Sequence, residues 1–189
     1  MVTPTLTYEK MQELSERSDH NRRIVSELEP PLKELSKWET LPALEVGNRD
    51  GGSAIVILYY LQQVPRTWFT TVDVTECPPL ITEWVEKLGI PHKHWKMPQA
   101  DFMEKHMNST NGWGFVFLDA DHSQATCSAD IRKLAPLMER GGMIAVDDVN
   151  DWPTLPEFEG LERVKYEGVD QGSFTAPSHG QHICYWRKA

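Results

Sequence analysis

A glycine-rich turn lies at residues 45–53, Glu45-Val-Gly-Asn-Arg-Asp-Gly-Gly-Ser53. The apolar segment that leads into it, Leu41–Val46, predicts a buried strand, and the mostly apolar segment at 52–63 predicts a helix. A strand, a tight glycine turn and a helix, in this order, begin the doubly wound α/β sheets, which bind ligands at the carboxyl ends of their strands. The turn therefore predicts a fold class and, with it, the place of a binding site.

Beyond the turn, apolar segments continue to alternate with amphipathic ones. The expected strands are Trp68–Val74, 92–97, Phe115–Leu118 and Met143–Val146, and the expected helices are 79–88, 101–108 and 124–138. Strands separated by helices lie parallel and are covered on both faces, because each crossover needs a helix to return the chain. Near the C-terminal end, Leu161–Gly168 and His182–Trp186 predict two more strands around a loop at 170–180. We expect a doubly wound, mostly parallel, Rossmann-like α/β sheet of about seven strands with an antiparallel hairpin at its C-terminal edge.

Residues 1–40 have a different pattern, which predicts helices. Between Tyr8 and Leu28, charged and apolar residues alternate in a loosely amphipathic way. We expect Pro30-Pro31 to interrupt this helix, because proline lacks a backbone N–H and its ring clashes with the preceding turn. A shorter helix should follow and end near Trp38. The chain is thus expected to consist of an N-terminal helical segment, 1–40, packed on a ligand-binding domain, 41–189.

The composition excludes several functional classes. The 189 residues are 40% apolar and 25% charged, as in an ordinary globular protein, and carry a net charge of −9. This excess of acids argues against a nucleic-acid partner, which requires clustered Lys and Arg. The three cysteines form no Cys-x-x-Cys pair, and the longest apolar run, Ala54–Leu61, is too short to cross a bilayer. We expect a cytoplasmic protein with no membrane or nucleic-acid partner.

Carboxylates stand at the predicted ends of three strands. Asp73 is placed where a carboxylate can accept hydrogen bonds from both hydroxyls of a ribose. Asp119 ends a later strand, and Asp147 and Asp148 end the next one. These three acids would repel one another without a cation, and Mg²⁺ prefers such oxygen ligands. The sequence therefore predicts a magnesium site at Asp119, Asp147 and Asp148; the alternative is that Asp121, Asp147 and Asp148 cap helices or turns.

The glycine turn does not fit a phosphate ligand. Arg49 stands where a dinucleotide fingerprint needs its second glycine, and no Lys-Ser/Thr pair follows the glycines as in a P-loop. A ligand without phosphate that carries a positive charge and an ammonium group would suit the carboxylates of Glu45 and Asp50, and S-adenosylmethionine is such a ligand. The alternative is that Gly51-Gly52 is a structural turn and Asp73 a helix cap.

Two further motifs follow the turn, Phe115-Val-Phe-Leu-Asp-Ala-Asp-His-Ser123 and Gly141-Gly-Met-Ile-Ala-Val-Asp-Asp-Val149. With the turn, which reads Glu-x-Gly-x-x-x-Gly, they resemble the motifs of class I S-adenosylmethionine-dependent methyltransferases. Among these, the Asp-x-Asp-His-Ser and Gly-Gly-x-Ile-x-x-Asp-Asp patterns are similar to those of small-molecule O-methyltransferases, such as the catechol and caffeoyl-coenzyme A enzymes. The resemblance runs from about Leu41 to Asn150.

This resemblance implies methyl transfer from S-adenosylmethionine to a hydroxyl of a small molecule. It implies that Glu45, Gly47 and Ser53 hold the methionine end of the cofactor and that Asp73 binds the ribose. It also implies that the metal at the three strand-end acids holds the substrate hydroxyl. The resemblance further implies that Gln99, Ala100 and Asp101 hold the adenine. The complete candidate cofactor-binding set is Glu45, Gly47, Asp50, Gly51, Ser53, Asp73, Gln99, Ala100, Asp101 and Asp119.

His122 and Asp119 are the candidate catalytic residues. His122 stands where the catechol enzyme has a catalytic lysine, and an imidazole that titrates near neutrality suits removal of a hydroxyl proton. The alternative is that His122 orients Asp119 or caps the following helix. His92 and His94 share one face of a predicted strand and are interpreted as structural or solvated.

Two other functions remain open from the sequence. A protein could bind S-adenosylmethionine without catalysis, although the intact acids and His122 argue against this. A nicotinamide-dependent oxidoreductase could use a similar sheet, although Arg49 argues against it. The methyl acceptor cannot be read from the chain, and Trp113 and Trp152 could line an aromatic pocket or belong to the core. A large substrate cap would need a second subunit, so a homodimer is one arrangement that the sequence allows.

Overall fold

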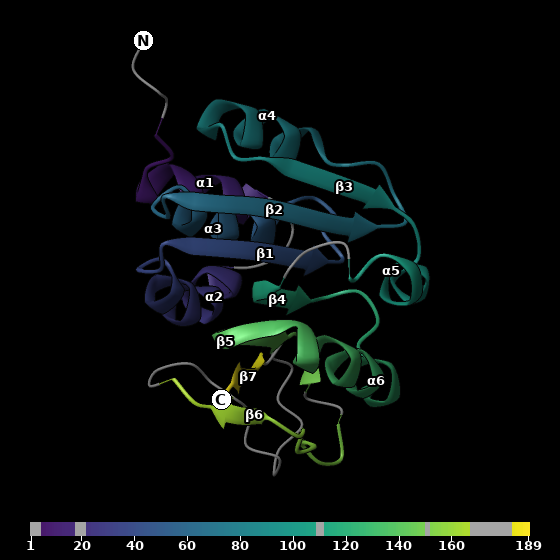
Figure 1. Ribbon diagram of the computed structural model, residues 1–189. Coiled ribbons are helices and arrows are strands. Elements are labelled where there is room, and N and C mark those ends of the chain that lie inside the picture. The colour runs from purple at the N-terminus through teal and green to yellow at the C-terminus, as the bar shows by residue number, and fades with distance from the viewer. Residues whose placement is uncertain (1–4, 18–21, 109–111, 150–151, 167–182) are drawn as a thin grey trace.

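A central sheet organises the chain (Figure 1). The computed structural model describes residues 5–17, 22–108, 112–149, 152–166 and 183–189. In these residues the strands are β1 (Thr40–Val46), β2 (Arg66–Asp73), β3 (His92–Lys96), β4 (Trp113–Leu118), β5 (Met138–Val146), β6 (Leu161–Val164) and β7 (Cys184–Lys188). They form one seven-stranded sheet in the order β3-β2-β1-β4-β5-β7-β6. Strands β1 to β5 are parallel, and β7 pairs antiparallel with both β5 and β6. The predicted fold class is confirmed, including its antiparallel C-terminal edge.

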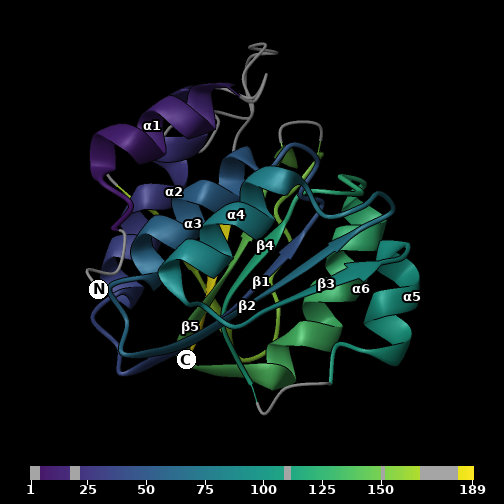
Figure 2. The same ribbon diagram turned by 90° about the horizontal axis from the view of Figure 1, so that it is seen from above.

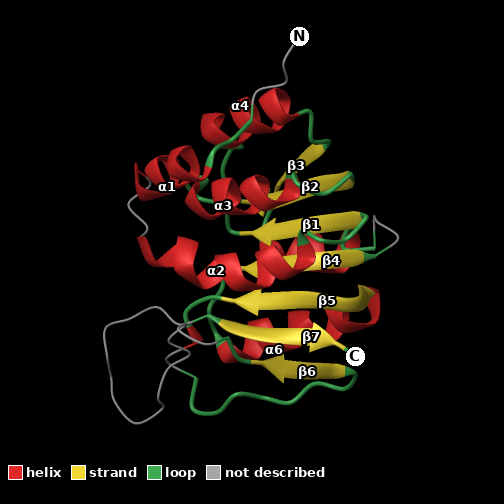
Figure 3. Cartoon of the chain, turned by 90° about the vertical axis from the view of Figure 1, so that its left-hand side faces the viewer, coloured by secondary structure: helices red, strands yellow, loops and turns green. Residues whose placement is uncertain are grey.

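Helices cover both faces of the sheet (Figures 2 and 3). One face carries α1 (Tyr8–Arg17), α2 (Arg22–Leu35), α3 (Gly52–Leu61) and α4 (Pro79–Leu88), and the other carries α5 (Gln99–Lys105) and α6 (Gln124–Leu134). Helix α3 contacts the sheet on one side and α1 and α2 on the other, which explains why its segment is apolar almost throughout. Among the described residues, no helix combines the length and the apolar character needed to span a membrane.

The central strands are buried on both faces, so alternate residues belong to different cores. In β1, Leu41 and Ala43 pack with α1–α4, whereas Leu44 and Val46 pack with α5 and α6. Side chains of a strand alternate between faces, so Glu45 points toward α3. A near-continuous apolar sequence is therefore what this position in a parallel sheet requires.

The expected interruption at Pro30-Pro31 is wrong, because both prolines lie inside α2. Pro31 has no N–H to donate to the carbonyl of Glu27, four residues earlier in the helix. The hydroxyl of Tyr185, on β7, donates to that carbonyl oxygen at 2.5 Å. Since the carbonyl has a partner from the far end of the chain, the helix tolerates the proline. No sequence pattern near Pro31 predicts this hydrogen bond from Tyr185.

The expected boundary between the helix at 124–138 and the strand at Met143–Val146 is also wrong. Helix α6 ends at Leu134, a 3-10 turn covers Ala135–Leu137, and β5 starts at Met138. Pro136 lies in this turn, where it cannot continue the hydrogen bonding of an α-helix. The C-terminal strands are β6 and β7 as expected, and the loop predicted at 170–180 lies outside the described residues.

Candidate active site

The carboxyl ends of four neighbouring strands lie in one row. Gly47 N donates to a carbonyl of β2, Asp119 N to one of β1 and Asp147 N to one of β4, at 2.8, 2.8 and 3.0 Å. These bonds extend the parallel ladders by one residue, so Asp73, Gly47, Asp119 and Asp147 stand side by side. A cavity of about 460 Å³ opens over the row, within the usual range for small-molecule sites. Its lining is Ile24, Val46, Gly47, Asn48, Arg49, Asp50, Gly52, Ser53, Val72, Asp73, Val74, Met97, Gln99, Asp119, Ala120, His122, Asp147 and Asp148.

The glycine turn and the loop after β4 make backbone contact at Gly47. Its φ of 87° lies in the left-handed region, and a Cβ atom added there would stand 2.2 Å from the carbonyl oxygen of Asp119. Gly51 also has a left-handed φ, of 85°, and precedes the first turn of α3. The first glycine thus permits close approach of two loops, and the second permits the sharp entry into the helix.

Asp73 accepts hydrogen bonds on both carboxylate oxygens. Asn48 N and Arg49 N donate to Oδ2 at 3.0 and 3.1 Å, and Thr75 N and Oγ1 donate to Oδ1 at 2.9 and 2.8 Å. Burial alone would raise the pKa of Asp73, but these hydrogen bonds outweigh it and hold the pKa below its ordinary value. The cavity therefore contains a fixed, ionised acceptor at the end of β2.

Glu45 lies outside the cavity lining, fully buried next to α3. The hydroxyl of Ser53, in the first turn of α3, donates to Oε1 of Glu45. Burial raises the pKa of Glu45 to about 8, although the Ser53 hydrogen bond opposes the rise and the charge of Asp73 adds to it. The other oxygen, Oε2, has no hydrogen-bond partner among the described residues. Glu45 thus joins β1 to the start of α3 and brings a buried acid close to the turn.

The structure brings the three predicted metal-ligand candidates together, since Asp119, Asp147 and Asp148 all line the cavity. Asp147 is 3% exposed and shares a hydrogen bond with Asp119. Burial and the neighbouring charges of Asp147, Glu45 and Asp148 raise the pKa of Asp119 well above its ordinary value. Burial and the charge of Asp148 also raise the pKa of Asp147. Burial and mutual repulsion therefore disfavour a state in which both carboxylates are ionised.

These acids have the donor chemistry of a site for a hard divalent cation. Oδ1 of Asp147 is buried and has no hydrogen-bond partner among the described residues, and a divalent cation could accept its lone pairs. In their present arrangement, however, no three His, Cys, Asp or Glu side chains of the described residues form a group that could hold a metal ion. Asp148 has a φ of 52°, a strained backbone conformation of the kind that concentrates at functional sites.

His122 lines the same cavity, close to Asp148. Its Nε2 lies 3.8 Å from Oδ2 of Asp148, and its Nδ1 is buried without a hydrogen-bond partner among the described residues. The backbone carbonyl of His122 accepts a hydrogen bond from Trp152 Nε1 at 2.8 Å. The N-cap of α6 is Ser123 rather than His122, so the helix-capping alternative for His122 is wrong. Asp121 does make a local turn, in which its Oδ1 accepts from Ser123 N.

Of the three residues predicted to bind adenine, one lines the cavity and two do not. Gln99 lines the cavity, where its Oε1 accepts from Asp121 N at 3.1 Å and its Nε2 donates to Asp130 at 2.6 Å. Ala100 is exposed, and Asp101 forms an ion pair with Lys105; neither lines the cavity. Gln99 thus links the start of α5 to the loop that carries Asp119 and to α6.

Several lining residues were missed by the sequence reasoning. Asn48 and Arg49 lie inside the quoted turn and could have been included, because their backbone amides reach Asp73. Val74 is 64% exposed, which is unusual for a large apolar side chain, but only the structure shows this. Ile24 comes from α2 and has no local signal. Trp113 and Trp152 are buried in the core between the sheet and α5 and α6 and do not line the cavity.

A family model described as a methyltransferase domain matches residues 44–149, which include the glycine turn and the three strand-end acids. Among curated proteins, the rhamnosyl O-methyltransferase of Mycobacterium tuberculosis (strain H37Rv) is 28% identical over 166 residues, which make up 85% of this chain and 62% of that relative. The corresponding protein of Mycobacterium leprae is 27% identical over 166 residues. The chain therefore spans less than two thirds of the length of these relatives.

Solved structures share the fold at low sequence identity. The MycE methyltransferase of mycinamycin biosynthesis, in complex with Mg, S-adenosylhomocysteine and mycinamycin VI, has a TM-score of 0.64 and 14% identity; the match covers 94% of this chain and 53% of that one. The O-methyltransferase TomG from Streptomyces achromogenes, involved in tomaymycin synthesis and solved with S-adenosylmethionine, has a TM-score of 0.63 and 12% identity over 95% of this chain and 87% of that one. At these identities the similarity is one of fold.

Proposed function

This chain belongs to the methyltransferase domain family, and from that premise we propose that it transfers the methyl group of S-adenosylmethionine to a hydroxyl group of a small molecule. One observation carries the proposal. A single cavity at the carboxyl ends of the strands is lined by the glycine turn and Asp73 on one side and by His122 and the strand-end acids on the other. Binding groups for a cofactor thus stand next to groups that can act on an acceptor.

The cofactor is assigned to the part of the cavity around β1 and β2. Gly47, Asp50 and Ser53 hold the methionine end, with Gly51 and the buried acid Glu45 behind them. The carboxylate of Asp50, which lines the cavity, suits an ammonium group and a sulfonium. Asp73, ionised and fixed by backbone donors, accepts from the ribose hydroxyls. The adenine is assigned to the first turn of α5, residues 99–101, where Gln99 lines the cavity.

Methyl transfer depends mainly on the alignment of two reactants, to which the cofactor contributes an electrophilic methyl group on its sulfonium. His122 is assigned as the general base that takes the proton of the acceptor hydroxyl at its imidazole. The carboxylate of Asp148, 3.8 Å from Nε2, stabilises the ring once it is protonated. Asp119, between the turn and β5, is assigned to orient the acceptor.

A divalent cation, Mg²⁺, is assigned to Asp119, Asp147 and Asp148. When bound it would act as a Lewis acid toward the acceptor hydroxyl and as a template for it. The unpaired Oδ1 of Asp147 and the raised pKa of Asp119, which burial and the neighbouring acids cause, support this assignment, because a bound cation would stabilise both carboxylates. MycE methyltransferase, which shares the fold, was solved with Mg.

The acceptor is assigned to the class of glycosides, with a sugar hydroxyl as the methylated group. The support is that the two curated relatives described above are rhamnosyl O-methyltransferases. Ile24, from the N-terminal helix α2, lines the cavity. Release of S-adenosylhomocysteine in the presence of a panel of rhamnosides and other glycosides tests this assignment. The homodimer and the cytoplasmic location stay predictions.

S-adenosylhomocysteine is expected to bind the wild-type protein, and Asp73→Ala is expected to weaken it by about 10- to 150-fold, the effect of about 1.5–3 kcal/mol from hydrogen bonds to a charged group. Isothermal titration calorimetry measures both affinities. Glu83→Ala is the matched control, since Glu83 is an exposed acid on α4 that pairs with Lys87. A wild-type protein that ignores S-adenosylhomocysteine but binds NADH would overturn the proposed function.

Methyl transfer is expected to stop in EDTA and to return when Mg²⁺ or Mn²⁺ is added, because both cations prefer carboxylate oxygens. Asp147→Asn should weaken Mg²⁺ binding by at least about tenfold, since it removes a buried charge that the cation would neutralise. Calorimetric titration with Mg²⁺ measures this affinity, and the turnover rate in EDTA measures the requirement. Full activity after exhaustive EDTA treatment would refute the metal assignment and leave the methyl transfer itself intact.

A further inference from the structure

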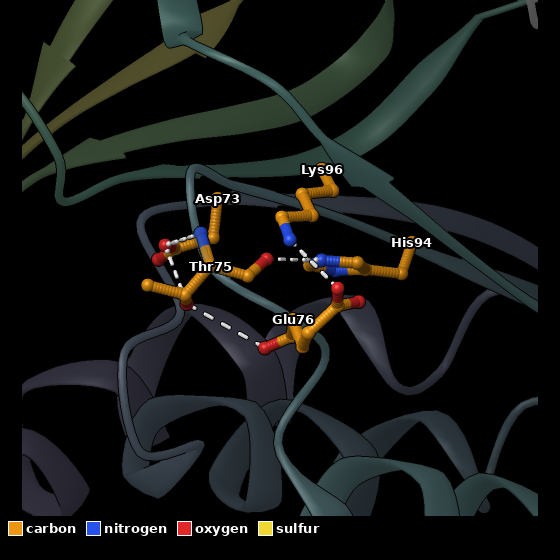
Figure 4. Close-up of polar contacts among 5 residues, drawn as sticks. All are labelled: Asp73, Thr75, Glu76, His94 and Lys96. Atoms are coloured by element: carbon orange, nitrogen blue, oxygen red, sulfur yellow. Dashed lines mark hydrogen bonds and ion pairs between the residues drawn. The ribbon is translucent and has the colours of Figure 1, made fainter.

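Two histidines on the edge strand β3 contact one buried threonine of β2. His92 Nε2 and His94 Nδ1 lie 3.0 and 2.9 Å from Thr71 Oγ1. On its other side, His94 Nε2 lies 3.0 Å from the carbonyl oxygen of Thr75 (Figure 4). Thr71 and His94 are register partners of a parallel pair, so their side chains leave the sheet on the same face. The contacts form a continuous chain that ends at the loop after β2.

The donors of this chain can be assigned. A carbonyl oxygen only accepts, so the proton of neutral His94 lies on Nε2, and Nδ1 accepts from the Thr71 hydroxyl. The Thr71 oxygen then accepts from Nε2 of His92. Burial, with the nearby His94, lowers the pKa of His92 to about 4, which keeps that ring neutral. All the donors point one way, from His92 through Thr71 and His94 to Thr75.

Thr75, at the end of the chain, holds the carboxylate of Asp73. Its backbone N and its hydroxyl donate to Asp73 Oδ1 at 2.9 and 2.8 Å, two of the hydrogen bonds that fix this carboxylate (Figure 4). Thr75 itself lies in the exposed loop between β2 and α4. A residue in an exposed loop holds its partners loosely unless other contacts fix its position. The hydrogen bond from His94 to the Thr75 carbonyl fixes Thr75 to the sheet.

We propose that His94 is a positioning residue for cofactor binding. By holding the Thr75 carbonyl, it fixes the Thr75 amide and hydroxyl against Asp73, and so keeps the carboxylate oriented for the ribose hydroxyls. This inference rests on the proposed function, because it requires Asp73 to bind the ribose. From the sequence, His94 is interpreted as structural or solvated. Its proposed positioning role adds an effect on cofactor affinity.

The same strand offers a matched control. Lys96, two positions along β3, forms an ion pair with Glu76 of the same loop at 2.7 Å (Figure 4). The two side chains are 53% and 81% exposed, and exposed ion pairs contribute little to stability. Lys96→Ala therefore alters the same strand and the same loop without breaking the hydrogen-bond chain.

The experiment compares the binding of S-adenosylhomocysteine to the wild type, His94→Ala, His94→Asn, His94→Gln and Lys96→Ala by calorimetry. His94→Ala should weaken binding by about 5- to 10-fold, as expected for one lost hydrogen bond. Gln can place an N–H near the position of Nε2 and should restore affinity to within about twofold, whereas Asn reaches only the position of Nδ1 and should not. Lys96→Ala should stay within about twofold of the wild type. In turnover assays, His94→Ala should raise the KM for S-adenosylmethionine and leave kcat unchanged.

A double mutant separates positioning from general damage. With Asp73→Ala in place, His94→Ala should have no further effect on affinity, because the residue it positions is gone. If the wild type binds and Asp73→Ala weakens binding, but His94→Ala and His94→Asn bind like the wild type, the inference fails and the proposed function stands. If His94→Ala fails to fold in a thermal melt, equal affinities of the Gln and Asn variants contradict the inference. A wild type that does not bind S-adenosylhomocysteine refutes the proposed function and the inference together.

Discussion

Gly47→Ala is expected to weaken S-adenosylhomocysteine binding and to lower the rate of methyl transfer by about 100-fold or more, the loss of rate that a displacement of about 1 Å at reacting groups can cause. The new methyl group would meet backbone rather than a flexible side chain, 2.2 Å from the carbonyl oxygen of Asp119 and 2.8 Å from the amide nitrogen of Ala120. This clash is relieved only if the glycine turn or the loop after β4 moves. Either movement takes Asp119 out of line with Asp147 and Asp73. Calorimetry measures the affinity, and thermal unfolding measures the accompanying loss of stability.

Gly89→Ala is the control for this variant. Gly89 follows α4, also has a left-handed φ, of 66°, and has no atom within 4 Å of an added Cβ. It therefore carries the backbone strain of an alanine in the left-handed region, about 1–2 kcal/mol, without the clash. Gly89→Ala should melt at a lower temperature than the wild type and bind with unchanged affinity. If Gly47→Ala binds and turns over like Gly89→Ala, the close approach at Gly47 has no role in the site.

The second large effect is expected for His122→Ala, which should lower kcat by about 10²- to 10⁴-fold while affinity for S-adenosylhomocysteine stays near that of the wild type. The substitution removes the imidazole but keeps the backbone carbonyl that accepts from Trp152, so the loop retains this anchor. Steady-state kinetics with the acceptor found in the glycoside panel measure kcat. His106→Ala is the matched histidine control, since His106 stacks on Trp95 outside the cavity.

A Mg²⁺ titration of His122→Ala distinguishes a base from an orienting residue. If His122 only orients Asp119, metal affinity should fall and excess Mg²⁺ should restore the rate. If it removes the proton, the rate should stay low at saturating metal. Full recovery of the rate at saturating Mg²⁺ would therefore show that His122 is not a catalytic residue.

The position of the site could be predicted from sequence because parallel strands impose it. In such a sheet the residues that follow neighbouring strands must meet at one edge, so a glycine turn after one strand and acids after others are brought together. The structure aligns Gly47, Asp119 and Asp147 through backbone hydrogen bonds of 2.8–3.0 Å. Strand boundaries shifted by a few residues, but the carboxyl ends, which carry the candidate groups, were placed within one residue.

Contacts between distant segments could not be predicted. Helix α2 continues through Pro31, and the hydroxyl of Tyr185 donates to the carbonyl of Glu27 within it, a contact that nothing near residue 31 indicates. The link from His94 to Thr75 depends on the register of β2 and β3, which a pattern of residues does not specify. The raised pKa of Asp119 depends mainly on its burial, whereas the sequence indicates only that acids lie close together.

The order β5-β7-β6 has a consequence for how the chain is made. Strand β6 joins the sheet through β7, which comes later in the sequence, and the same strand supplies Tyr185 to α2. During synthesis, β6 and the proline-containing helix both stay incomplete until residues 184–188 have left the ribosome. Until then β5 presents an unpaired edge with Ile144 and Val146, a template for pairing with another chain. We therefore expect nascent or truncated chains to aggregate more readily than the complete sheet, in which β7 covers this edge of β5.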